Sequence, residues 1–418
     1  IESARFSAAV PLLTAIQFFE FTYFLNFFSN SNTFPVPAPE AQNLLFKTRF
    51  IAFSSSFPIS GSNNLIFLFI LNQKIPKIKI CYHQFVGRLL NLGKKTMNMK
   101  RNKIFIRVDS GVEIGAGHAM RCLSLAQILK KMNFDLCFIS KKTKGGISKL
   151  FADKGFPVYY IQDNHSKSKK SEIIKNDAKQ TAKIVIKHQT ESSWILVDHY
   201  DLDFKWEKIL RKYVNKIIVI DDLARKHDSD LLLDQNYNKN LKTRYNKLVP
   251  KKSIKLLGPK YALLRDEFSI LRKTVKPRKN FKRILISFGG SDPTNETGKV
   301  LSAIKILKTN KQFLEVNVVI GKSDKNKRKI KQLCNSIPNA KFYQNVYKIG
   351  KLMYKSDLAI GAGGSSIWER FCLGLPTIVS IVAKHQQETT ESLAKNEYLI
   401  NVGPAKNLSI KKYVEIFE

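Results

Sequence analysis

The sequence predicts an α/β protein made of two doubly wound domains, and two features of its pattern lead to that fold class. From about residue 97 onward, short apolar runs rich in β-branched residues alternate with longer segments whose apolar residues recur every three or four positions. This alternation stops at a basic, proline-containing stretch at 271–282 and then starts again. Strands that alternate with helices form parallel sheets covered on both faces. We therefore expect one domain at 97–270, a linker, a second domain at 283–418 and a ligand cleft between the domains.

The first half of the pattern contains five expected strands. They are the runs KIFIRVD, FDLCFIS, FPVYYIQ, SWILVDHY and KIIVIDD, at 103–109, 134–140, 156–162, 193–200 and 216–222. A glycine turn after the first strand leads into a helix in which four apolar residues share one face: Cys122, Leu125, Ala126 and Leu129. Loops that follow the strands of a parallel sheet meet at one edge, and ligands bind there.

The second half repeats the same alternation. Its expected strands are RILISFGG, LEVNVVIG, AKFYQNV, DLAIGAGG and PTIVSIV, at 283–290, 314–321, 340–346, 357–364 and 376–382. Helices are expected from Asn295, at 327–337 and at 366–374. Two doubly wound domains of similar size result.

The composition limits the classes of partner. The chain carries 71 Lys and Arg against 33 Asp and Glu, a net charge of +38, and such a chain can bind nucleic acid. Here the lysines are scattered and no nucleic-acid-binding module is recognisable, so we expect solvating surface charge and no nucleic-acid partner. The five cysteines are far apart without a CxxC pair, which indicates neither a zinc site nor a disulfide framework and favours the cytoplasm. No metal-ligand motif and no cofactor motif is present in the sequence.

Residues 1–96 are expected to lie outside the enzyme fold. The segment MNMKRNKIFIRVDSG has the pattern of an ordinary protein start, so we expect the natural protein to begin at Met97 or Met99. The alternative is a membrane anchor at 10–28, although a glutamate and a glutamine interrupt that apolar run. For 97–418 we expect no stable association with membranes.

Two glycine-rich turns in the second half are candidate phosphate sites. Phosphate groups bind where backbone N–H groups point at the ligand and a helix begins. The turn SFGGSDPTNET places three candidate binding residues after its strand: Gly289, Gly290 and Ser291. The polar residues that follow are expected to cap the next helix: Asp292, Thr294 and Asn295. One such turn is common in any α/β protein.

The second turn, GAGGSSIWE at 361–369, repeats this design. Its candidate residues at the helix start are Gly364, Ser365 and Ser366. Glu369 then lies one turn inside the helix, where its carboxylate can accept hydrogen bonds from ribose hydroxyls. Two such turns, with a serine pair and a glutamate, predict a site for a nucleoside diphosphate.

His118 is the candidate catalytic residue of the first half. It stands directly behind the Gly115–Ala116–Gly117 turn, at the start of a helix. The helix dipole disfavours an imidazolium there, so we expect a neutral ring that can accept a proton, as the activation of water requires. The alternative is a structural histidine that caps its own helix.

Polar residues follow two other strands at the same expected sheet edge. Asp198 and Tyr200 end the segment VDHY, together with His199, and Asp222 follows the next strand. We expect them to hydrogen-bond a sugar; the alternative is that they cap loops. Three other histidines stand in Lys-rich stretches and are expected to be solvated: His165, His188 and His227.

Six segments together carry a resemblance to a known family. They are RVDSGVEIGAGHAMRCLSLA, LVDHYDLD, IDDLARKHDSDLLLDQN, GPKYALLRDEF, SFGGSDPTN and GAGGSSIWERFCLGLP. In this order they resemble the UDP-2,4-diacetamido-2,4,6-trideoxy-β-L-altropyranose hydrolases of pseudaminic acid biosynthesis, over about residues 100–403. The resemblance implies a GT-B-like fold of two Rossmann-type domains, similar to the glycosyltransferase that adds N-acetylglucosamine to the peptidoglycan lipid precursor. It also implies a metal-independent, inverting hydrolysis that releases UDP from a UDP-linked diacetamido trideoxy sugar.

The resemblance also implies roles for individual positions in the first half. His118 matches the family's catalytic histidine, and Tyr200 matches its substrate-binding tyrosine. Gly117 belongs to the glycine turn beside the sugar, and Arg121, which ends the G-H-x-x-R part of the same motif, is expected to bind the substrate.

In the second half, the resemblance places four residues at the nucleotide: Ser365, Ser366, Glu369 and Val346, the last through its backbone at the uracil ring. Gln386 matches a glutamine near the substrate. His385 stands where the family often has asparagine, a departure that alters one polar contact although histidine can still donate a hydrogen bond.

Two alternative functions stay open. A glycosyltransferase on the same fold would use an acceptor hydroxyl in place of water and would need an acceptor site, often an apolar patch on the first domain, which the sequence after Met97 does not indicate. A basic nucleic-acid-binding protein would bind with a steep dependence on salt and without any need for His118.

Overall fold

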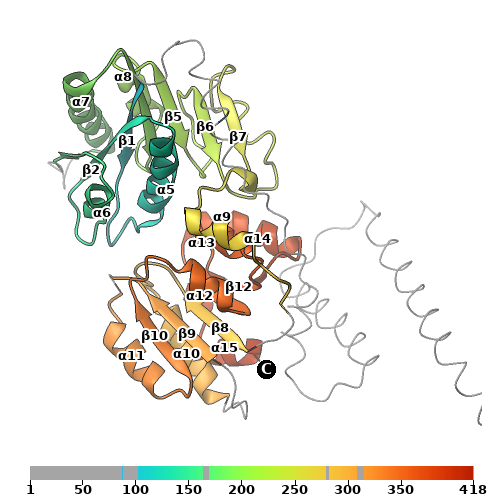
Figure 1. Cartoon of the computed structure of the whole chain (residues 1–418). Helices are drawn as coiled ribbons and strands as arrows, with labels where there is room; N and C mark the ends of the chain where they lie inside the picture. The colour runs from blue at the N-terminus through green and yellow to red at the C-terminus, as the bar shows by residue number, and fades with distance from the viewer. Residues whose placement is uncertain are drawn as a thin grey trace, which may run out of the picture. The chain divides into compact units, whose positions relative to one another are not determined.

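The computed structural model describes Gly87 and residues 102–162, 169–278, 282–307, 315–322 and 324–417. In these ranges the chain forms two parallel β-sheets, each covered by helices, which confirms the predicted α/β fold class (Figure 1). Residues 1–96, apart from Gly87, lie outside the described residues, as does the expected start at Met97 or Met99.

The first sheet has the strand order β3-β2-β1-β4-β5-β6-β7. Its strands are β1 (Asn102–Val108), β2 (Asp135–Lys141), β3 (Val158–Ile161), β4 (Ser192–Asp198), β5 (Lys216–Ile220), β6 (Leu231–Asp234) and β7 (Ile254–Leu257). The helices between them are α5 (Gly117–Lys131), α6 (Ser148–Asp153), α7 (Lys170–His188) and α8 (Phe204–Leu210), followed by η2 (Pro259–Tyr261). The five predicted strands are present within two residues at each end. The sequence pattern missed β6 and β7, which have only four residues each and are too short for a periodic signal.

The second sheet has the strand order β10-β9-β8-β11-β12-β13. Its strands are β8 (Arg283–Ser287), β9 (Glu315–Ile320), β10 (Ala340–Gln344), β11 (Leu358–Ala362), β12 (Thr377–Ile381) and β13 (Ile400–Pro404). The helices are α9 (Asp266–Arg272), α10 (Glu296–Ile306), α11 (Lys327–Asn335), α12 (Gly350–Lys355), α13 (Ser366–Cys372), α14 (Gln387–Lys395) and α15 (Ile410–Phe417), with η3 (Lys384–Gln386) and η4 (Ala405–Asn407).

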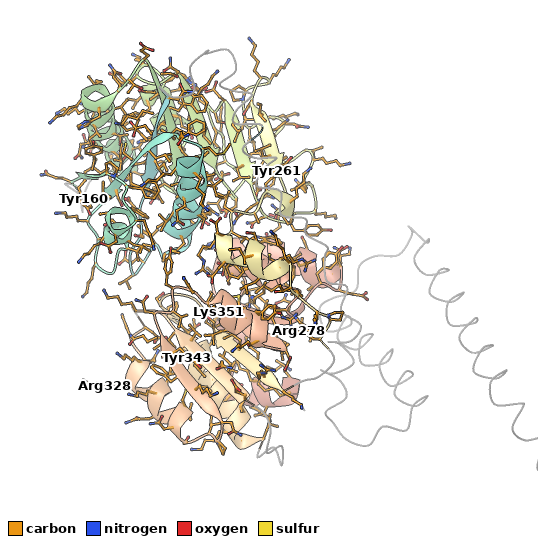
Figure 2. The ribbon with its side chains drawn as sticks, in the orientation of Figure 1. Tyr160, Tyr261, Arg278, Arg328, Tyr343 and Lys351 are labelled. Atoms are coloured by element: carbon orange, nitrogen blue, oxygen red, sulfur yellow. The ribbon has the colours of Figure 1, made fainter. Side chains whose placement is uncertain are left out.

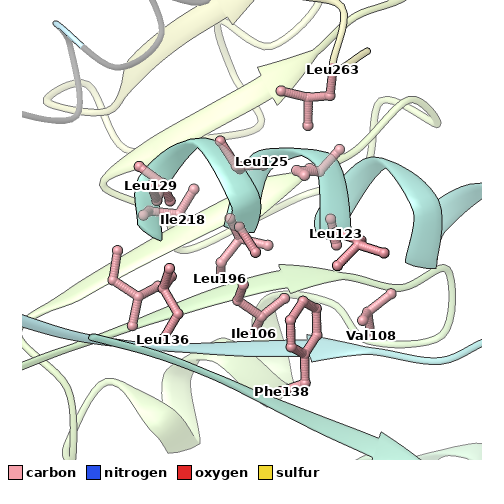
Figure 3. Close-up of a cluster of buried hydrophobic side chains, with 14 of the residues drawn as sticks. Ile106, Val108, Leu123, Leu125, Leu129, Leu136, Phe138, Leu196, Ile218 and Leu263 are labelled. Carbon is pink, nitrogen blue, oxygen red and sulfur yellow. The ribbon is translucent and has the colours of Figure 1, made fainter. Parts of the chain in front are cut away.

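Central strand β1 buries both faces because helices cover the sheet on both sides. Ile104 and Ile106 pack with α5, whose predicted apolar face is wholly buried, as Figure 3 shows for part of this cluster. Phe105 points to the opposite face, where it packs with apolar residues of α7 and α8. Each large apolar side chain buried in this way contributes roughly 1.5–3 kcal/mol. The double coverage explains why the strands read as continuous apolar runs.

Both sheets reverse their strand order at a central pair, β1–β4 in the first and β8–β11 in the second. Loops that leave the two strands of such a pair run in opposite directions and open a crevice at the carboxyl ends, where ligands bind. In the first sheet, Val108 is paired with Asp198. In the second, Ser287 is paired with Gly361. The predicted site residues therefore follow the strands that form the two crevices.

The stretch expected as a linker is bound to the second sheet's helices. Helix α9 extends to Arg272, and its Phe268 packs in the same apolar cluster as residues of α13. Further along, Arg278 donates through Nε to the carbonyl of Ser356 at 2.7 Å and through Nη1 to the carbonyl of Leu373 at 2.9 Å (Figure 2). The boundaries at 270 and 282 stay a prediction. Within the described part of the chain, no helix combines the length and apolar content needed to cross a bilayer.

Candidate active site

His118 lies at the carboxyl-end crevice of the first sheet. Helix α5 begins at Gly117, directly after the loop from β1, so that His118 is its second residue. Nδ1 of His118 is 2.5 Å from Oδ1 of Asp198, the last residue of β4. A carboxylate only accepts hydrogen bonds, so Nδ1 donates to Asp198, and Nε2 is the ring nitrogen that holds the lone pair when the ring is neutral. This is the arrangement in which an imidazole serves as a base.

Arg121 fixes the other side of Asp198. It lies one helical turn after His118 and donates through Nε to Oδ2 and through Nη2 to Oδ1 of Asp198, both at 2.6 Å. Its Nη1 donates to Oδ2 of Asp222 at 3.2 Å. Burial acts to raise the pKa of Asp198, but Arg121 and His118 outweigh it and hold that pKa well below its usual range.

These contacts engage two residues that were expected at the sugar. Asp198 is 1% exposed, and its oxygens accept from His118 and Arg121; that it also binds a sugar stays a prediction. Arg121 is 6% exposed and serves the same carboxylate. His118 therefore interacts with a specific partner, Asp198, as well as with the dipole of its helix. The sequence alone could not show this hydrogen bond.

Tyr200 and His385 complete the surroundings of the His118 ring. The Tyr200 ring meets His118 edge-on, with centroids 4.4 Å apart, and lies 5.3 Å from the ring of His385. Burial and the nearby Asp222 carboxylate raise the pKa of Tyr200, which keeps its phenol protonated. Burial of the His385 ring lowers its pKa, with His118 acting in the same direction and Asp222 against it. His385 belongs to η3 of the second domain, so residues of both domains meet here.

Asp222 leaves one oxygen without a partner. Its Oδ2 accepts from Arg121, whereas its buried Oδ1 has no hydrogen-bond partner among the described residues. An unsatisfied buried acceptor is costly, about 1–3 kcal/mol. Because it lies beside Tyr200, it is available to a hydroxyl or amide of a bound ligand.

The loop that carries Tyr200 is held by residues that the sequence reading missed. Arg225 donates to the backbone carbonyls of His199, Tyr200 and Leu202, at 3.1, 2.6 and 2.9 Å, and its Nε donates to Asp221. Arg225 follows the end of β5 by five residues. An arginine at such a position is common, so the sequence provided no reason to select Arg225. The effect is to fix the backbone beneath Tyr200.

A second buried network holds His199. Its Nδ1 accepts from the Asp201 N–H, so Nε2 carries the proton and donates to Oδ2 of Asp109 at 3.1 Å. Asp109 is paired with Arg107, which also binds Asp177. His199 therefore fixes the loop, with both ring nitrogens occupied.

The expectation that His227 is solvated is wrong. It is 3% exposed, and its Nδ1 lies 2.6 Å from Oε1 of Glu207 and its Nε2 3.4 Å from Oδ2 of Asp221. Burial acts to lower its pKa, but the two carboxylates outweigh it and raise the pKa to about 9. His188 is half-buried and stacks on Tyr159 at 4.3 Å, and His165 lies outside the described residues.

The crevice of the second sheet contains a cavity of about 200 Å³. Four predicted nucleotide-site residues line it: Gly289, Val346, Ser366 and Glu369. Residues not singled out from the sequence complete the lining, among them Ser287, Gly321, Asn345 and Ile349. The cavity brings together the loops after β8, β9 and β10 and the start of α13.

The remaining predicted residues of the second half are not part of this lining. Gly290 and Ser291 lie in the exposed or half-buried turn after β8, and Ser365 and Gly364 are half-buried at the turn before α13. Gln386 is 8% exposed; its Oε1 accepts from the Val382 N–H.

Glycine is required where these turns touch. A Cβ on Gly321 would lie 1.9 Å from the carbonyl oxygen of Gly290, and one on Gly361 would lie 2.2 Å from that of Ser287. Both contacts are with backbone, which cannot move aside cheaply. A Cβ on Gly117 would lie 3.6 Å from Oγ of Ser365, so the glycine turn of the first domain approaches the serine pair of the second.

The cap of α10 is Asp292, which accepts from the N–H groups of Glu296 and Thr297 at 2.9 and 2.8 Å. Thr294 and Asn295, also expected as caps, make no such bond. In the part of the chain that the structure describes, no three His, Cys, Asp or Glu side chains are grouped as metal ligands.

The chain is similar to several known proteins. Residues 284–412 match the family model of the glycosyltransferase family 28 C-terminal domain. The chain is 29% identical over 313 residues to an uncharacterized protein of Methanocaldococcus jannaschii, covering 73% of this chain and 60% of that protein. The chain thus spans about 60% of that relative's length.

Two named relatives are more informative. The UDP-2,4-diacetamido-2,4,6-trideoxy-beta-L-altropyranose hydrolase of Campylobacter jejuni is 27% identical over 298 residues, which cover 71% of this chain and 97% of the hydrolase. The spore coat polysaccharide biosynthesis protein SpsG of Bacillus subtilis is 24% identical over 304 residues, which cover 71% of this chain and 83% of SpsG. The chain is a distant homologue of both, with a C-terminal domain of the glycosyltransferase family 28 type.

Solved structures show the fold. MurG of Acinetobacter baumannii is similar with a TM-score of 0.53 at 12% identity, covering 76% of this chain and 90% of that chain. TcCGT1, solved in complex with UDP, has a TM-score of 0.53 at 10% identity with the same coverage. The two parallel-sheet domains therefore have the GT-B fold that the sequence predicted.

Proposed function

We propose that the chain is a hydrolase that releases UDP from UDP-2,4-diacetamido-2,4,6-trideoxy-β-L-altropyranose, in pseudaminic acid biosynthesis. The observation that carries this proposal is the pair of Asp198 and His118, which leaves Nε2 of the histidine as a base at the first sheet's crevice. The 27% identity to the Campylobacter hydrolase supports the substrate class. The coarser statement, an enzyme of nucleotide-sugar metabolism, is supported by that relative and by the family 28 match.

In this proposal the nucleotide occupies the second domain. The uracil ring enters the 200 Å³ cavity beside Val346, and Glu369 accepts hydrogen bonds from the ribose. The diphosphate lies against the turns at 289–291 and 364–366, where backbone N–H groups and hydroxyls can donate to it. The sugar then extends past Gly117, which lies near Ser365, toward His118.

The chemical step is a displacement by water at the anomeric carbon. The water oxygen forms a bond to that carbon while Nε2 of His118 takes a proton from the water. The bond between the anomeric carbon and the diphosphate oxygen breaks, and its electron pair leaves with UDP. Attack from the face opposite UDP inverts the configuration. General-base assistance of this kind supplies about 10²- to 10⁴-fold, and hydrogen bonds from the turns stabilise the departing charge.

In this proposal three side chains hold the sugar. The unpartnered Oδ1 of Asp222 accepts a hydrogen bond from a sugar hydroxyl or acetamido N–H. Tyr200 packs beside the His118 ring, and neutral His385 donates from the second domain. His385 stands where the family often has asparagine. We therefore expect the polar contact to the sugar at this position to differ from that in the family.

The direct test is to incubate the purified protein with the UDP-diacetamido sugar and no acceptor. We expect equal amounts of UDP and free sugar, and NMR of the anomeric proton at early times should show the inverted configuration. Conversion of the UDP-sugar into an isomer with UDP still attached would contradict the proposal, and so would retention of configuration.

A GT-B glycosyltransferase is the second candidate, because the family that matches residues 284–412 is a glycosyltransferase family. It would transfer the sugar to an acceptor hydroxyl and leave the UDP-sugar intact without one. Release of free sugar in the absence of acceptor separates the two activities.

We further propose that the enzyme works in the cytoplasm on a small nucleotide-linked sugar. The four cysteines in the described ranges are free and buried, which suits a reducing compartment: Cys122, Cys137, Cys334 and Cys372.

A further inference from the structure

Arg265 joins the two walls of the nucleotide cavity. It stands between η2 and α9, outside the cavity lining. Its Nη2 donates to Oε1 of Glu369 at 2.8 Å, on the wall formed by α13, and its Nη1 donates to the backbone carbonyl of Tyr347, on the loop after β10. That loop carries Val346, the residue expected at the uracil ring.

The neighbouring residues hold the Arg265 side chain in this position. Oε1 of Glu267 lies 3.0 Å from its Nη1, and Oε2 of Glu267 accepts from the N–H of Gly350, where α12 begins. The guanidinium also lies over the Phe268 ring, 5.1 Å from its centroid. The side chain is only 12% exposed, and its planar fork spans two fixed acceptors that a flexible ammonium could not span in the same way.

We propose that Arg265 is a positioning residue for nucleotide binding: it fixes the Glu369 carboxylate so that its second oxygen faces the ribose. This inference rests on the proposed UDP site. Among the residues that the structure describes, Oε1 of Glu369 has Arg265 as its partner, and Oε2 has none. Oε2 of Glu369 therefore accepts from the ribose diol in a single orientation. Because the Glu369 side chain is already ordered in the free protein, its ordering adds no entropic cost to binding.

Arg265 has a second, electrostatic effect on the same carboxylate. Glu369 lines the cavity proposed for the nucleotide, next to the turn at 364–366 proposed for the diphosphate, and two negative groups in one site repel each other. The guanidinium balances the charge of Glu369 from the side away from the ligand. Without it, the carboxylate both turns more freely and opposes the ligand's charge.

The experiment is a calorimetric titration of UDP into the wild-type protein and three variants. Arg265→Met removes the charge and both donors, and we expect the affinity for UDP to fall about tenfold or more. Arg265→Lys restores the charge but not the two-pronged geometry, so it should recover only part of the loss. The matched control is Arg272→Met: Arg272 ends α9, donates to the Cys372 carbonyl and lines no part of the cavity, and its removal should leave the affinity within twofold.

A second ligand, 2′,3′-dideoxy-UDP, separates a positioning role from a general loss of structure at the site. The quantity compared is the ratio of the affinities for UDP and for 2′,3′-dideoxy-UDP in each protein. In the wild-type protein, loss of the ribose hydroxyls should weaken binding about tenfold. In Arg265→Met, that penalty should shrink to about twofold, because the carboxylate no longer meets the diol in its productive orientation. The same penalty in both proteins would overturn the inference, even if Arg265→Met binds UDP less tightly.

The outcomes distinguish this inference from the proposed function. Wild-type protein that does not bind UDP would contradict the proposed nucleotide site itself. Wild-type protein that binds UDP, together with an Arg265→Met variant of equal affinity, would overturn the role of Arg265 alone. Should Arg265→Met fail to fold, Arg265→Lys with the two ligands gives the same comparison.

Discussion

The carboxyl-end edges of the two sheets, where we propose that the ligand binds, are built from different chemical groups. At the first sheet, buried side chains form a charged network in which Asp198 joins His118 to Arg121. At the second sheet, glycine turns, two serines and Glu369 line a cavity together with apolar side chains and the buried Arg370. Buried charges are tolerated only when they are paired, and pairing fixes their geometry. The first edge therefore holds one reactive nitrogen in place, whereas the second edge leaves room and N–H donors for an anionic ligand.

The largest expected effect comes from removing the base and leaving the second edge intact. His118→Asn should lower kcat about 10²- to 10⁴-fold because proton transfer to Nε2 is lost. The affinity for UDP should stay within about twofold, since Glu369 and the turns are untouched. Steady-state kinetics and calorimetry check both parts. His188→Asn, at the end of α7, is the matched control and should leave kcat unchanged; a His118→Asn enzyme with near-wild-type kcat would contradict the assignment.

Substitution of Asp198, the hydrogen-bond partner of His118, tests whether the orientation of the imidazole ring matters. Asp198→Asn should lower kcat by about 10²-fold, because the amide no longer holds the Nδ1 proton of His118 as a carboxylate does. It also leaves the buried Arg121 with Asp222 as its remaining charge partner, and this should reduce the free energy of unfolding by about 3 kcal/mol. Kinetics and urea denaturation measure the two effects. Asp203→Asn changes only the cap of α8 and should leave kcat within twofold.

The charges behind the first edge should give the protein a specific pH dependence. The pKa of His227 is raised to about 9 in the folded protein against 6.5 for a free ring. The protonated ring therefore contributes stability in full below pH 6.5, and the contribution is lost as the pH rises through 9. The loss should be on the order of 3 kcal/mol. Denaturation at several pH values should show a flatter profile for His227→Gln; the same slope in both proteins would contradict this prediction.

The smallest expected effect comes from disturbing the second edge and sparing the first. In Gly321→Ala the new Cβ collides with the Gly290 carbonyl, so the turn after β8 must shift. We expect the affinity for UDP to fall about tenfold, with kcat at saturating substrate little changed. Unchanged affinity would mean that this turn does not bind the nucleotide.

The same contrast explains what the sequence could and could not predict. Glycine turns and serine pairs after strands are local signals, so the residues that line the cavity, such as Gly289 and Ser366, could be named from spacing. His118 also carried a local signal, its place behind a glycine turn. Its partner could not be foreseen, because Asp198 lies 80 positions away and meets His118 only when β4 pairs with β1.

Residues that act through the backbone were the hardest to predict. Arg225 and Arg265 bind carbonyl oxygens of distant loops, and a carbonyl leaves no mark in the sequence. His227 was misjudged because its neighbours in sequence are charged, whereas its neighbours in space are two buried carboxylates.

In the proposed mechanism, water attacks the anomeric carbon and not the phosphorus. Turnover in water enriched in ¹⁸O, with the released UDP examined by mass spectrometry, tests this step directly. We expect unlabelled UDP, because the diphosphate keeps its bridging oxygen and the label enters the sugar. One ¹⁸O atom on the β-phosphate of UDP would show attack at phosphorus and would contradict the role given to His118.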